Sequence, residues 1–111
     1  MLSRKYSLRA KDFGRILKQG RIFNTPYFRL RSLPNNFPNI RVGIIISAKV
    51  SKKAVLRNRL KRQISEIFRL NFSKLQPGYD IVITVSGSMV GKKYQEIKEE
   101  VLRALKTIKL F

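Results

Sequence analysis

The chain has 111 residues, of which 43% are hydrophobic, and it carries 25 Lys and Arg against 6 Asp and Glu, for a formal net charge of +19. This length allows one domain with one modest core, and the hydrophobic fraction is too high for a disordered basic tail. The charge creates a strong positive field that attracts polyanions and destabilises the isolated folded state. The sequence contains neither His nor Cys, which excludes disulfides, thiol chemistry and the commonest general base.

The N-terminal part of the chain predicts a basic arm followed by a short helix. Residues 1–10 have few apolar positions and are expected to form an arm that is flexible unless bound. Between Lys11 and Gln19 the apolar residues Phe13, Ile16 and Leu17 recur at i, i+3 and i+4, which indicates an amphipathic helix. We expect Gly20 to end this helix.

Residues 22–33 predict extended structure that is interrupted near Pro26. After the proline, alternation places Phe28 and Leu30 on one face of a strand. The same alternation places three other side chains together on the opposite face: Tyr27, Arg29 and Arg31. A face with one aromatic ring and two cations is unusual for a core and suits a ligand.

The rest of the chain predicts two buried strands and two long helices. The β-branched run within Arg41–Ser47 is expected to form a central strand covered on both faces. A helix follows from about Lys53 to Phe72, then a strand over residues 80–85 and a last helix over residues 94–108. This order predicts one α+β domain spanning residues 1–111, built as a two-layer α-β sandwich with elements in the order α-β-β-β-α-β-α.

The positive charge is concentrated in one window of the sequence. Half of the acidic residues lie in the last helix, at Glu96, Glu99 and Glu100, whereas residues 49–62 contain none. The same window holds seven basic residues: Lys49, Lys52, Lys53, Arg57, Arg59, Lys61 and Arg62. A helix built only for solubility would mix both signs of charge, so the window predicts a nucleic-acid surface. A merely solvated basic face is the alternative.

One stretch of the sequence resembles the bacterial ribonuclease P protein subunit. It begins with Arg41-Val42-Gly43-Ile44, continues through Ser47 and Lys49, and ends with Ala54-Val55-Leu56-Arg57-Asn58-Arg59-Leu60-Lys61-Arg62. The opening Lys11-Asp12-Phe13 with Gly20, the strand from Asp80 and the closing helix also match, so the resemblance covers nearly the whole chain. Arg-Asn-Arg alone is a weak signal, but its place after this strand and before Lys61-Arg62 makes it more specific.

The resemblance implies a ribonucleoprotein endonuclease that removes the 5′ leader from precursor tRNA. It implies that the RNA subunit and its bound Mg²⁺ perform catalysis, while the protein binds this RNA and the leader and supplies no catalytic side chain. By this resemblance, the residues that contact the catalytic RNA are Arg57, Asn58 and Arg59, with Lys61 and Arg62, and we expect the basic loop to add Lys49, Lys52 and Lys53. The implied fold is like domain 2 of ribosomal protein S5, with a left-handed β-α-β crossover. General rules would predict the right hand.

The resemblance also implies a leader-binding cleft between the first helix and the open face of the sheet. Its positions correspond here to Phe13, Leu17 and Arg31, and the strand-face argument adds Tyr27 and Arg29. The sequence departs from the family pattern at one turn and at four single positions. Ser51-Lys52-Lys53 replaces a turn that often contains Gly. Leu17 and Arg31 stand at positions that are often aromatic, Ala48 stands where Lys is usual, and Ser65 replaces a frequent Arg. Without the resemblance, Phe13 and Leu17 would be assigned to the core.

The sequence leaves one other function open, which is a non-catalytic RNA-binding protein such as a ribosomal protein. A self-sufficient nuclease is disfavoured because the chain lacks His and clustered carboxylates for a base or a metal cage. We expect no metal site on the protein, since Mg²⁺ favours phosphate oxygens and keeps its waters. The N-terminus has no apolar signal-peptide segment, and no apolar run is long enough to span a bilayer. We therefore expect a cytoplasmic protein without a membrane partner.

Overall fold

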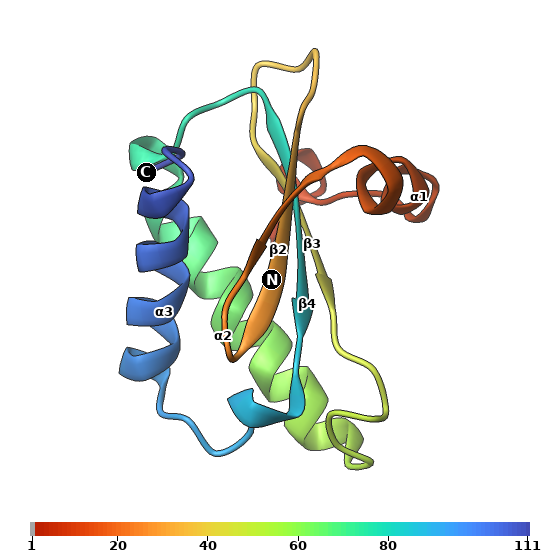
Figure 1. Cartoon of the computed structure of the whole chain (residues 1–111), viewed down its shortest axis with the longest axis vertical. Coiled ribbons are helices and arrows are strands. Elements are labelled where there is room, and N and C mark those ends of the chain that lie inside the picture. The colour runs from red at the N-terminus through yellow and green to blue at the C-terminus, as the bar shows by residue number, and fades with distance from the viewer. Residues whose placement is uncertain (1) are drawn as a thin grey trace.

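The computed structural model describes residues 2–111. In this part of the chain, three α-helices and four strands follow one another in the predicted order (Figure 1). Their bounds are α1 Ala10–Gln19, β1 Arg21–Asn24, β2 Phe28–Pro34, β3 Arg41–Ile45, α2 Ala54–Asn71, β4 Tyr79–Val85 and α3 Tyr94–Thr107. Short 3-10 turns occupy Arg4–Tyr6, Phe72–Lys74 and Gly87–Met89.

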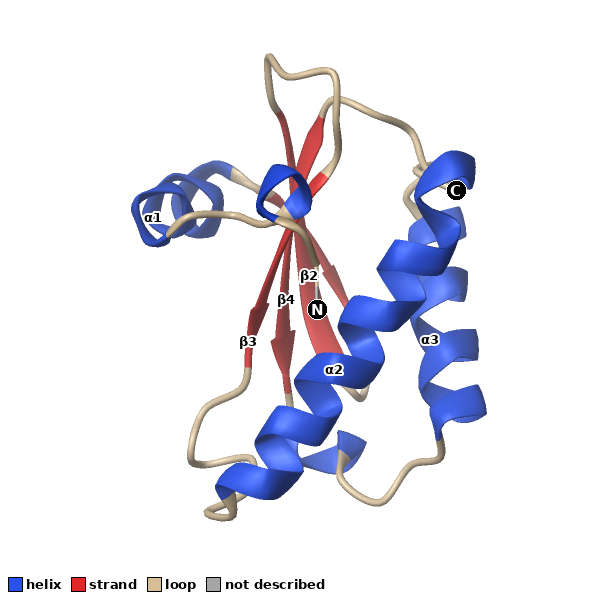
Figure 2. Ribbon diagram, turned by 180° about the vertical axis from the view of Figure 1, so that it is seen from behind, coloured by secondary structure: helices blue, strands red, loops and turns tan. Residues whose placement is uncertain are grey.

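The four strands form one sheet in the order β1-β2-β4-β3. Strand β2 is antiparallel to both β1 and β4, whereas β3 is parallel to β4. Helices α2 and α3 cover one face of the sheet, and α1 lies on the other face near one end of the strands (Figures 1 and 2). The parallel neighbours β3 and β4 are joined through α2, and the left hand that the resemblance implies for this crossover stays an expectation. Because α1 covers only one end of the strands, the rest of that face of the sheet stays open.

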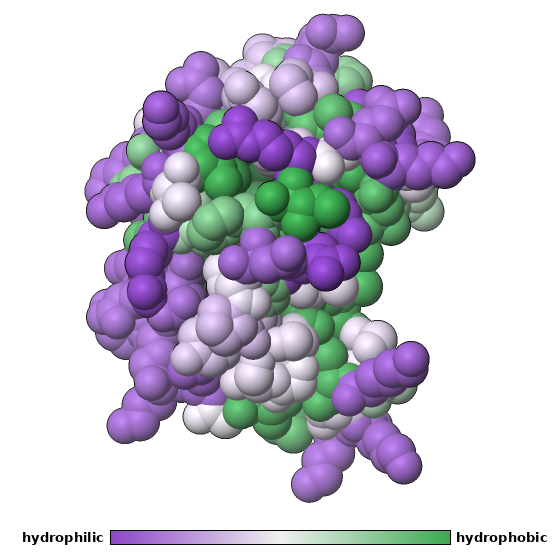
Figure 3. Space-filling view, viewed as in Figure 1, coloured by the Kyte–Doolittle hydropathy of each residue, from purple (hydrophilic) through white to green (hydrophobic). Residues whose placement is uncertain are grey.

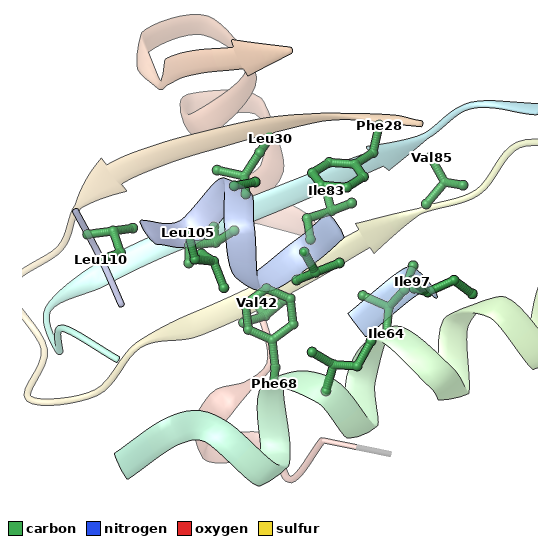
Figure 4. Packing of buried hydrophobic residues seen from close by; sticks show 14 of the residues in the cluster. Phe28, Leu30, Val42, Ile64, Phe68, Ile83, Val85, Ile97, Leu105 and Leu110 are labelled. Atoms are coloured by element: carbon green, nitrogen blue, oxygen red, sulfur yellow. The ribbon is translucent and has the colours of Figure 1, made fainter. Parts of the chain in front are cut away.

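The core lies between the sheet and the pair α2 and α3 (Figure 4). Period-two alternation sends Phe28 and Leu30 of β2, with Ile83 of the neighbouring β4, into this layer, where all three are almost fully buried. Helix α2 packs against them through four buried residues at helical spacing, Leu60, Ile64, Ile67 and Phe68. Truncating one such side chain to alanine should cost about 2–5 kcal/mol of folding free energy. This packing fixes the orientation of α2 and therefore determines which side of the helix faces solvent.

Strand β3 lies at an edge of the sheet, which corrects the prediction of a central strand. Val42 is 3% exposed, but Ile44 and Ile45 are only partly buried. The continuous apolar run arises because both faces of this edge strand are partly covered. Helix α2 lies over one face, and the ring of Phe13 from α1 lies over Gly43 on the other.

The N-terminal segment packs against the domain, in contrast to the arm expected from the sequence. The ring of Tyr6 stacks on that of Phe72, with centroids 4.2 Å apart and an interplanar angle of 21°. Ser7 forms a parallel bridge with Val42, and the Leu8 amide donates to the Val42 carbonyl at 3.1 Å. This segment therefore pairs with the start of the exposed edge of β3. No helix within residues 2–111 is both long enough and apolar enough to cross a membrane.

Candidate nucleic-acid interface

The first turns of α2 and the loop before them carry the basic window of the sequence. We call this region the basic helix surface; its members are Lys49, Lys52, Lys53, Arg57, Asn58, Arg59, Lys61 and Arg62. All of them are exposed except Arg57, which is partly buried. Figure 3 shows hydrophilic side chains projecting from the end of the molecule where α2 begins.

Arg57 differs from its neighbours because its guanidinium is engaged within the protein. Its Nη1 donates to the carbonyl of Ser51 at 2.6 Å and so ties the helix to the preceding loop. The hydroxyl of Ser51 accepts from the Lys53 amide at 3.2 Å, which further orders this loop. Arg57 therefore positions part of the basic helix surface in addition to contributing charge.

The basic helix surface has no acidic counterpart. Within residues 2–111, none of its cations lies within 4.0 Å of a carboxylate, whereas Arg69, further along α2, pairs with Glu66. The surface also displays Val55, which is 75% exposed. Uncompensated Arg and Lys around a rigid helix suit phosphate binding, since the guanidinium fork can hold a phosphate through two hydrogen bonds. The structure thus groups the predicted RNA-binding residues on one continuous surface.

A second candidate site lies on the open face of the sheet beside α1. We call it the sheet-face hollow; its volume is about 480 Å³. Its walls come from α1, from all four strands and from the ends of their loops: Leu17, Asn24, Thr25, Phe28, Arg29, Arg31, Ile45, Thr84, Val85 and Ser86. Figure 3 shows the outline of the molecule indented below α1, with apolar residues in the indentation. The predicted residues Leu17, Arg29 and Arg31 therefore meet at one place.

Two polar atoms in the walls of this hollow are buried without a partner. The Nε of Arg31 and the Oγ1 of Thr84 have no hydrogen-bond partner among residues 2–111. Such atoms are rare in folded proteins, and each needs an explanation. Beside them, Arg29 Nε donates to Asn24 Oδ1 at 2.7 Å, which holds that guanidinium over the sheet. A donor and a hydroxyl without partners beside an apolar wall are features of a binding site.

Tyr27 does not join this group, and the prediction that it shares a face with Arg29 and Arg31 is wrong. It lies before β2, in a turn where the Thr25 hydroxyl accepts from the Tyr27 amide at 3.1 Å and the Phe28 amide at 3.0 Å. This turn interrupts the alternation of the strand. The Tyr27 ring packs against the core cluster on the side of α2 and α3.

Phe13 lies close to the sheet-face hollow but outside its walls. Its ring is so near Gly43 that a Cβ added there would meet Phe13 Cζ at 2.4 Å. Phe13 lines a separate hollow of about 220 Å³ together with Lys61 and Ser65. Its partial burial shows that it anchors α1 to β3. Leu17, one turn later, is 39% exposed and free to contact a ligand.

A buried carboxylate fixes α1 on the sheet. Asp80 of β4 is fully buried and accepts hydrogen bonds from Arg15 of α1 at 2.6 Å and twice from Arg41 of β3 at 2.8 Å. The amide of Asn35 adds a fourth at 2.7 Å. Burial raises the pKa of Asp80, but the hydrogen bonds from Arg41 and then Asn35, with the nearby positive charge, outweigh it, so this pKa lies below its ordinary value. Asp80 is thus an ionised centre that orients the helix beside the sheet-face hollow.

No group of three His, Cys, Asp or Glu side chains in residues 2–111 is arranged to hold a metal ion. Both oxygens of Asp80 accept hydrogen bonds from cationic or amide donors. Asp12 caps the first turn of α1 by accepting from the Arg9 amide at 3.1 Å. These carboxylates therefore act in ion pairing and helix capping.

Ala48 and Ser65, two of the departures from the family pattern, lie in different surroundings. Ala48 is exposed in the loop before α2, so it removes one possible cation from the basic helix surface. Ser65 is 3% exposed and lines the hollow beneath Phe13.

Sequence reasoning predicted three of the ten residues that line the sheet-face hollow and missed the other seven: Asn24, Thr25, Phe28, Ile45, Thr84, Val85 and Ser86. Asn24, Ile45 and Thr84 come from three different strands, and only the sheet order brings them together. One signal was present for Thr84, because strict alternation along β4 places it on the same face as Asp80 and Val82.

Comparison with known proteins gives one consistent family. A family model described as Ribonuclease P matches residues 2–109. The chain is 38% identical to the "Ribonuclease P protein component" of Cyanothece sp., covering 95% of this chain and 93% of the relative. The corresponding protein of Pseudanabaena sp. is also 38% identical, over 92% of this chain and 89% of the relative.

Solved structures agree with these sequences. The ribonuclease P protein of Thermotoga maritima superposes with a TM-score of 0.85 at 32% identity, covering 93% of this chain and 97% of that one. A mutant of the Staphylococcus aureus protein, described as defective in mRNA degradation activity, superposes with a TM-score of 0.89 at 30% identity, covering 96% and 90%. Since sequence and fold agree over nearly the whole chain, it belongs to the ribonuclease P protein family.

Proposed function

We propose that this protein serves ribonuclease P through two surfaces: the basic helix surface binds the catalytic RNA, and the sheet-face hollow holds the 5′ leader of precursor tRNA. The activity follows from the family, whose members are the protein component of the endoribonuclease that matures the 5′ end of tRNA. The non-catalytic ribosomal-protein alternative is disfavoured by the same membership. The observation that carries the two-surface proposal is that the surfaces lie on opposite sides of one sheet.

The charge distribution supports RNA binding by α2. The cations of the basic helix surface have no carboxylate partner within residues 2–111, so phosphates can replace counterions there without breaking ion pairs. Counterion release makes such binding strong at low salt and weak at high salt. Mg²⁺ fits the same scheme as an ion held mainly by RNA phosphates, where it supports cleavage by the RNA. The cytoplasmic location expected from the sequence stays a prediction.

Binding of the catalytic RNA tests the role of α2. Arg59→Ala and Arg62→Ala should each weaken binding and reduce the slope of log K against log salt by about 1. Both residues are exposed, and neither forms an ion pair within residues 2–111, so thermal unfolding should change little. Lys106→Ala on α3 is the matched control and should leave the slope unaltered. An unchanged slope in the Arg variants would remove α2 from the RNA interface.

The partnerless polar atoms support a role for the sheet-face hollow in holding single-stranded RNA. A single strand is usually held by stacking of its bases combined with cationic contacts to its backbone. Arg31 can supply both, because a guanidinium plane stacks on a base while its N–H groups contact phosphate. Leu17 and Ile45 offer an apolar wall beside it.

The leader assignment is tested by comparing precursor tRNA with mature tRNA. Arg31→Ala and Thr84→Val should lower the affinity of the holoenzyme for leader-bearing substrate more than its affinity for mature tRNA. Thr84→Val nearly preserves side-chain volume while removing the hydroxyl, so it separates hydrogen bonding from packing. Equal losses for the two RNAs would exclude the hollow as the leader site.

A further inference from the structure

Another hollow lies on the α2 and α3 side of the sheet, between α2 and the loop that joins β4 to α3. Its volume is about 320 Å³, and we call it the α2–α3 hollow. It is lined by Leu56, Arg59, Leu60, Gln63, Val90, Gly91, Lys92 and Lys93. Leu60 is 6% exposed, whereas Val90 at the rim is 39% exposed. The lining thus combines apolar walls, one side-chain amide and three cations.

The loop that forms one wall is held in place by contacts with the turn between β1 and β2. The Ser86 hydroxyl donates to the Tyr27 carbonyl at 2.9 Å, and the Ser88 hydroxyl donates to the Pro26 carbonyl at 2.5 Å. Met89 is fully buried and anchors the loop from below. The wall is therefore built into the fold and does not depend on a ligand for its position.

Within residues 2–111, the side-chain cations of the α2–α3 hollow have no ion-pair partner, and one of them is held in position by an aromatic ring. Lys92 Nζ lies 4.0 Å from the centroid of the Tyr27 ring, a cation–π contact that limits the positions of its ammonium group. Within the described residues, the side-chain cations of Arg59, Lys92 and Lys93 form no ion pair. The nearby carboxylate of Glu96 accepts from the backbone amide of Lys93 at 2.9 Å, where it caps α3. Gln63 forms no side-chain hydrogen bond within residues 2–111 that would occupy its amide.

We propose that the α2–α3 hollow takes one unpaired nucleotide of the catalytic RNA. The base lies against Leu56, Leu60 and Val90, and the Gln63 amide, which both donates and accepts, meets its edge. Arg59, Lys92 and Lys93 contact the phosphates on either side. An unpaired base combines an apolar face with a polar edge and anionic neighbours, which matches this lining. The inference rests on the proposed function, because it assumes that α2 faces the catalytic RNA.

The position of the hollow favours the catalytic RNA over the leader. Arg59 belongs both to the basic helix surface and to the α2–α3 hollow, so one RNA can cover the two without a gap. The sheet-face hollow shares no lining residue with the α2–α3 hollow. A leader held there would have to extend past Ser86, at the end of β4, to reach Lys92 and Lys93.

Affinity for the catalytic RNA without substrate gives the first test. The double variant Lys92→Ala, Lys93→Ala should weaken binding and reduce the salt slope by about 2, one for each lost phosphate contact. The control Lys74→Ala, Lys106→Ala removes the same charge from exposed positions outside the hollow and should not change the slope by this amount. If the two double variants behave alike while Arg62→Ala still weakens binding, the α2–α3 hollow is excluded and the proposed function stands.

Crosslinking identifies the RNA at the hollow. Because the chain has no Cys, Val90→Cys can carry a single photoreactive label at the rim, and Thr107→Cys on α3 serves as the labelled control. The inference predicts a crosslink from residue 90 to one unpaired nucleotide of the catalytic RNA, with or without precursor tRNA, and none to that nucleotide from residue 107. A crosslink only to precursor tRNA, only to paired nucleotides, or to no RNA would overturn it. Thermal unfolding of each labelled variant confirms that the protein remains folded.

Discussion

The buried carboxylate of Asp80 links three segments that are distant in sequence: α1 through Arg15, the loop after β2 through Asn35, and β3 through Arg41. Arg41 also faces Asp12 at 3.5 Å and lies over the Phe37 ring at 4.3 Å. A charge buried to this degree is tolerated only because several donors satisfy it. Asp80 therefore determines the position of α1 and, through it, one wall of the sheet-face hollow.

Asp80→Asn should destabilise the protein by about 3 kcal/mol, since removing one partner leaves the other charges of a buried cluster uncompensated. This value is at the lower end of the usual range because the Arg15 side chain is 39% exposed and can be partly hydrated. Urea unfolding measures the loss. Glu66→Gln, which removes an exposed pair with Arg69, is the control and should change the unfolding midpoint little. Equal effects in the two variants would contradict the role of Asp80.

The lowered pKa of Asp80 predicts a pH dependence of stability. Its pKa is lower in the folded state than in the unfolded state, where the value for Asp is about 3.9. The stabilisation is therefore present above that value and is lost as the pH falls through the folded-state pKa. Unfolding free energy measured between about pH 6 and pH 2 should fall on acidification, and Asp80→Asn should flatten part of this fall. A parallel curve for the variant would show that other carboxylates dominate.

At the scale of elements, α1 depends on a close contact between Phe13 and the backbone of β3. Gly43→Ala would place a methyl group within 2.4 Å of the Phe13 ring. The overpacking should cost about 1–3 kcal/mol and shift α1 relative to the sheet, so leader-dependent affinity should fall as well.

The matched control is Gly14→Ala, at an exposed glycine next to Phe13 in α1. A Cβ at this position meets nothing within 4 Å, and alanine favours helix over glycine by about 1 kcal/mol. This variant should stabilise the protein without changing leader affinity. Chemical unfolding of both variants checks the pair, and a destabilised Gly14→Ala or a neutral Gly43→Ala would contradict the structure.

Periodicity was enough to predict which segments form helices and strands, because it depends on local alternation of apolar residues. Helix α2 and strand β4 were both predicted in this way. When a strand is apolar on both faces, its sequence does not show whether it lies at the edge or in the centre of the sheet. For this reason β3 was wrongly predicted to be a central strand. The pairing of β3 with only β4 and the N-terminal segment depends on chain topology.

For the candidate sites too, local patterns were sufficient for one surface, whereas the others depend on chain topology. The basic helix surface lies within one contiguous segment, so the charge pattern alone located it. The sheet-face hollow gathers residues from five elements, and only part of it was predicted. Tyr27 was misassigned because the Thr25 turn breaks the alternation on which its placement relied. The Asp80 cluster joins residues up to 65 positions apart, which no local pattern reveals.

At the scale of the whole molecule, the net charge of +19 opposes folding of the free protein. The ion pairs of Asp80, Glu66 and Glu100 neutralise only a small part of this charge. Repulsion is therefore distributed over the surface and is strongest at the basic helix surface, where no acid lies nearby. Under the proposed function, RNA bound at this surface would relieve the repulsion and gain counterion entropy.

Salt should therefore affect the free protein and its RNA complex in opposite directions. Raising NaCl from about 20 to 300 mM shortens the screening length from roughly 20 Å to about 6 Å, which weakens repulsion between cations and should raise the melting temperature of the free protein. Over the same range, affinity for the catalytic RNA should fall steeply. Differential scanning calorimetry and a binding titration in the same buffers measure both. Sodium sulfate at matched ionic strength separates screening from anion binding: equal stabilisation indicates screening, whereas much greater stabilisation by sulfate would mean that phosphate-like anions occupy sites on the folded protein. A melting temperature that does not rise with either salt would contradict the view that charge repulsion limits the stability of the free chain.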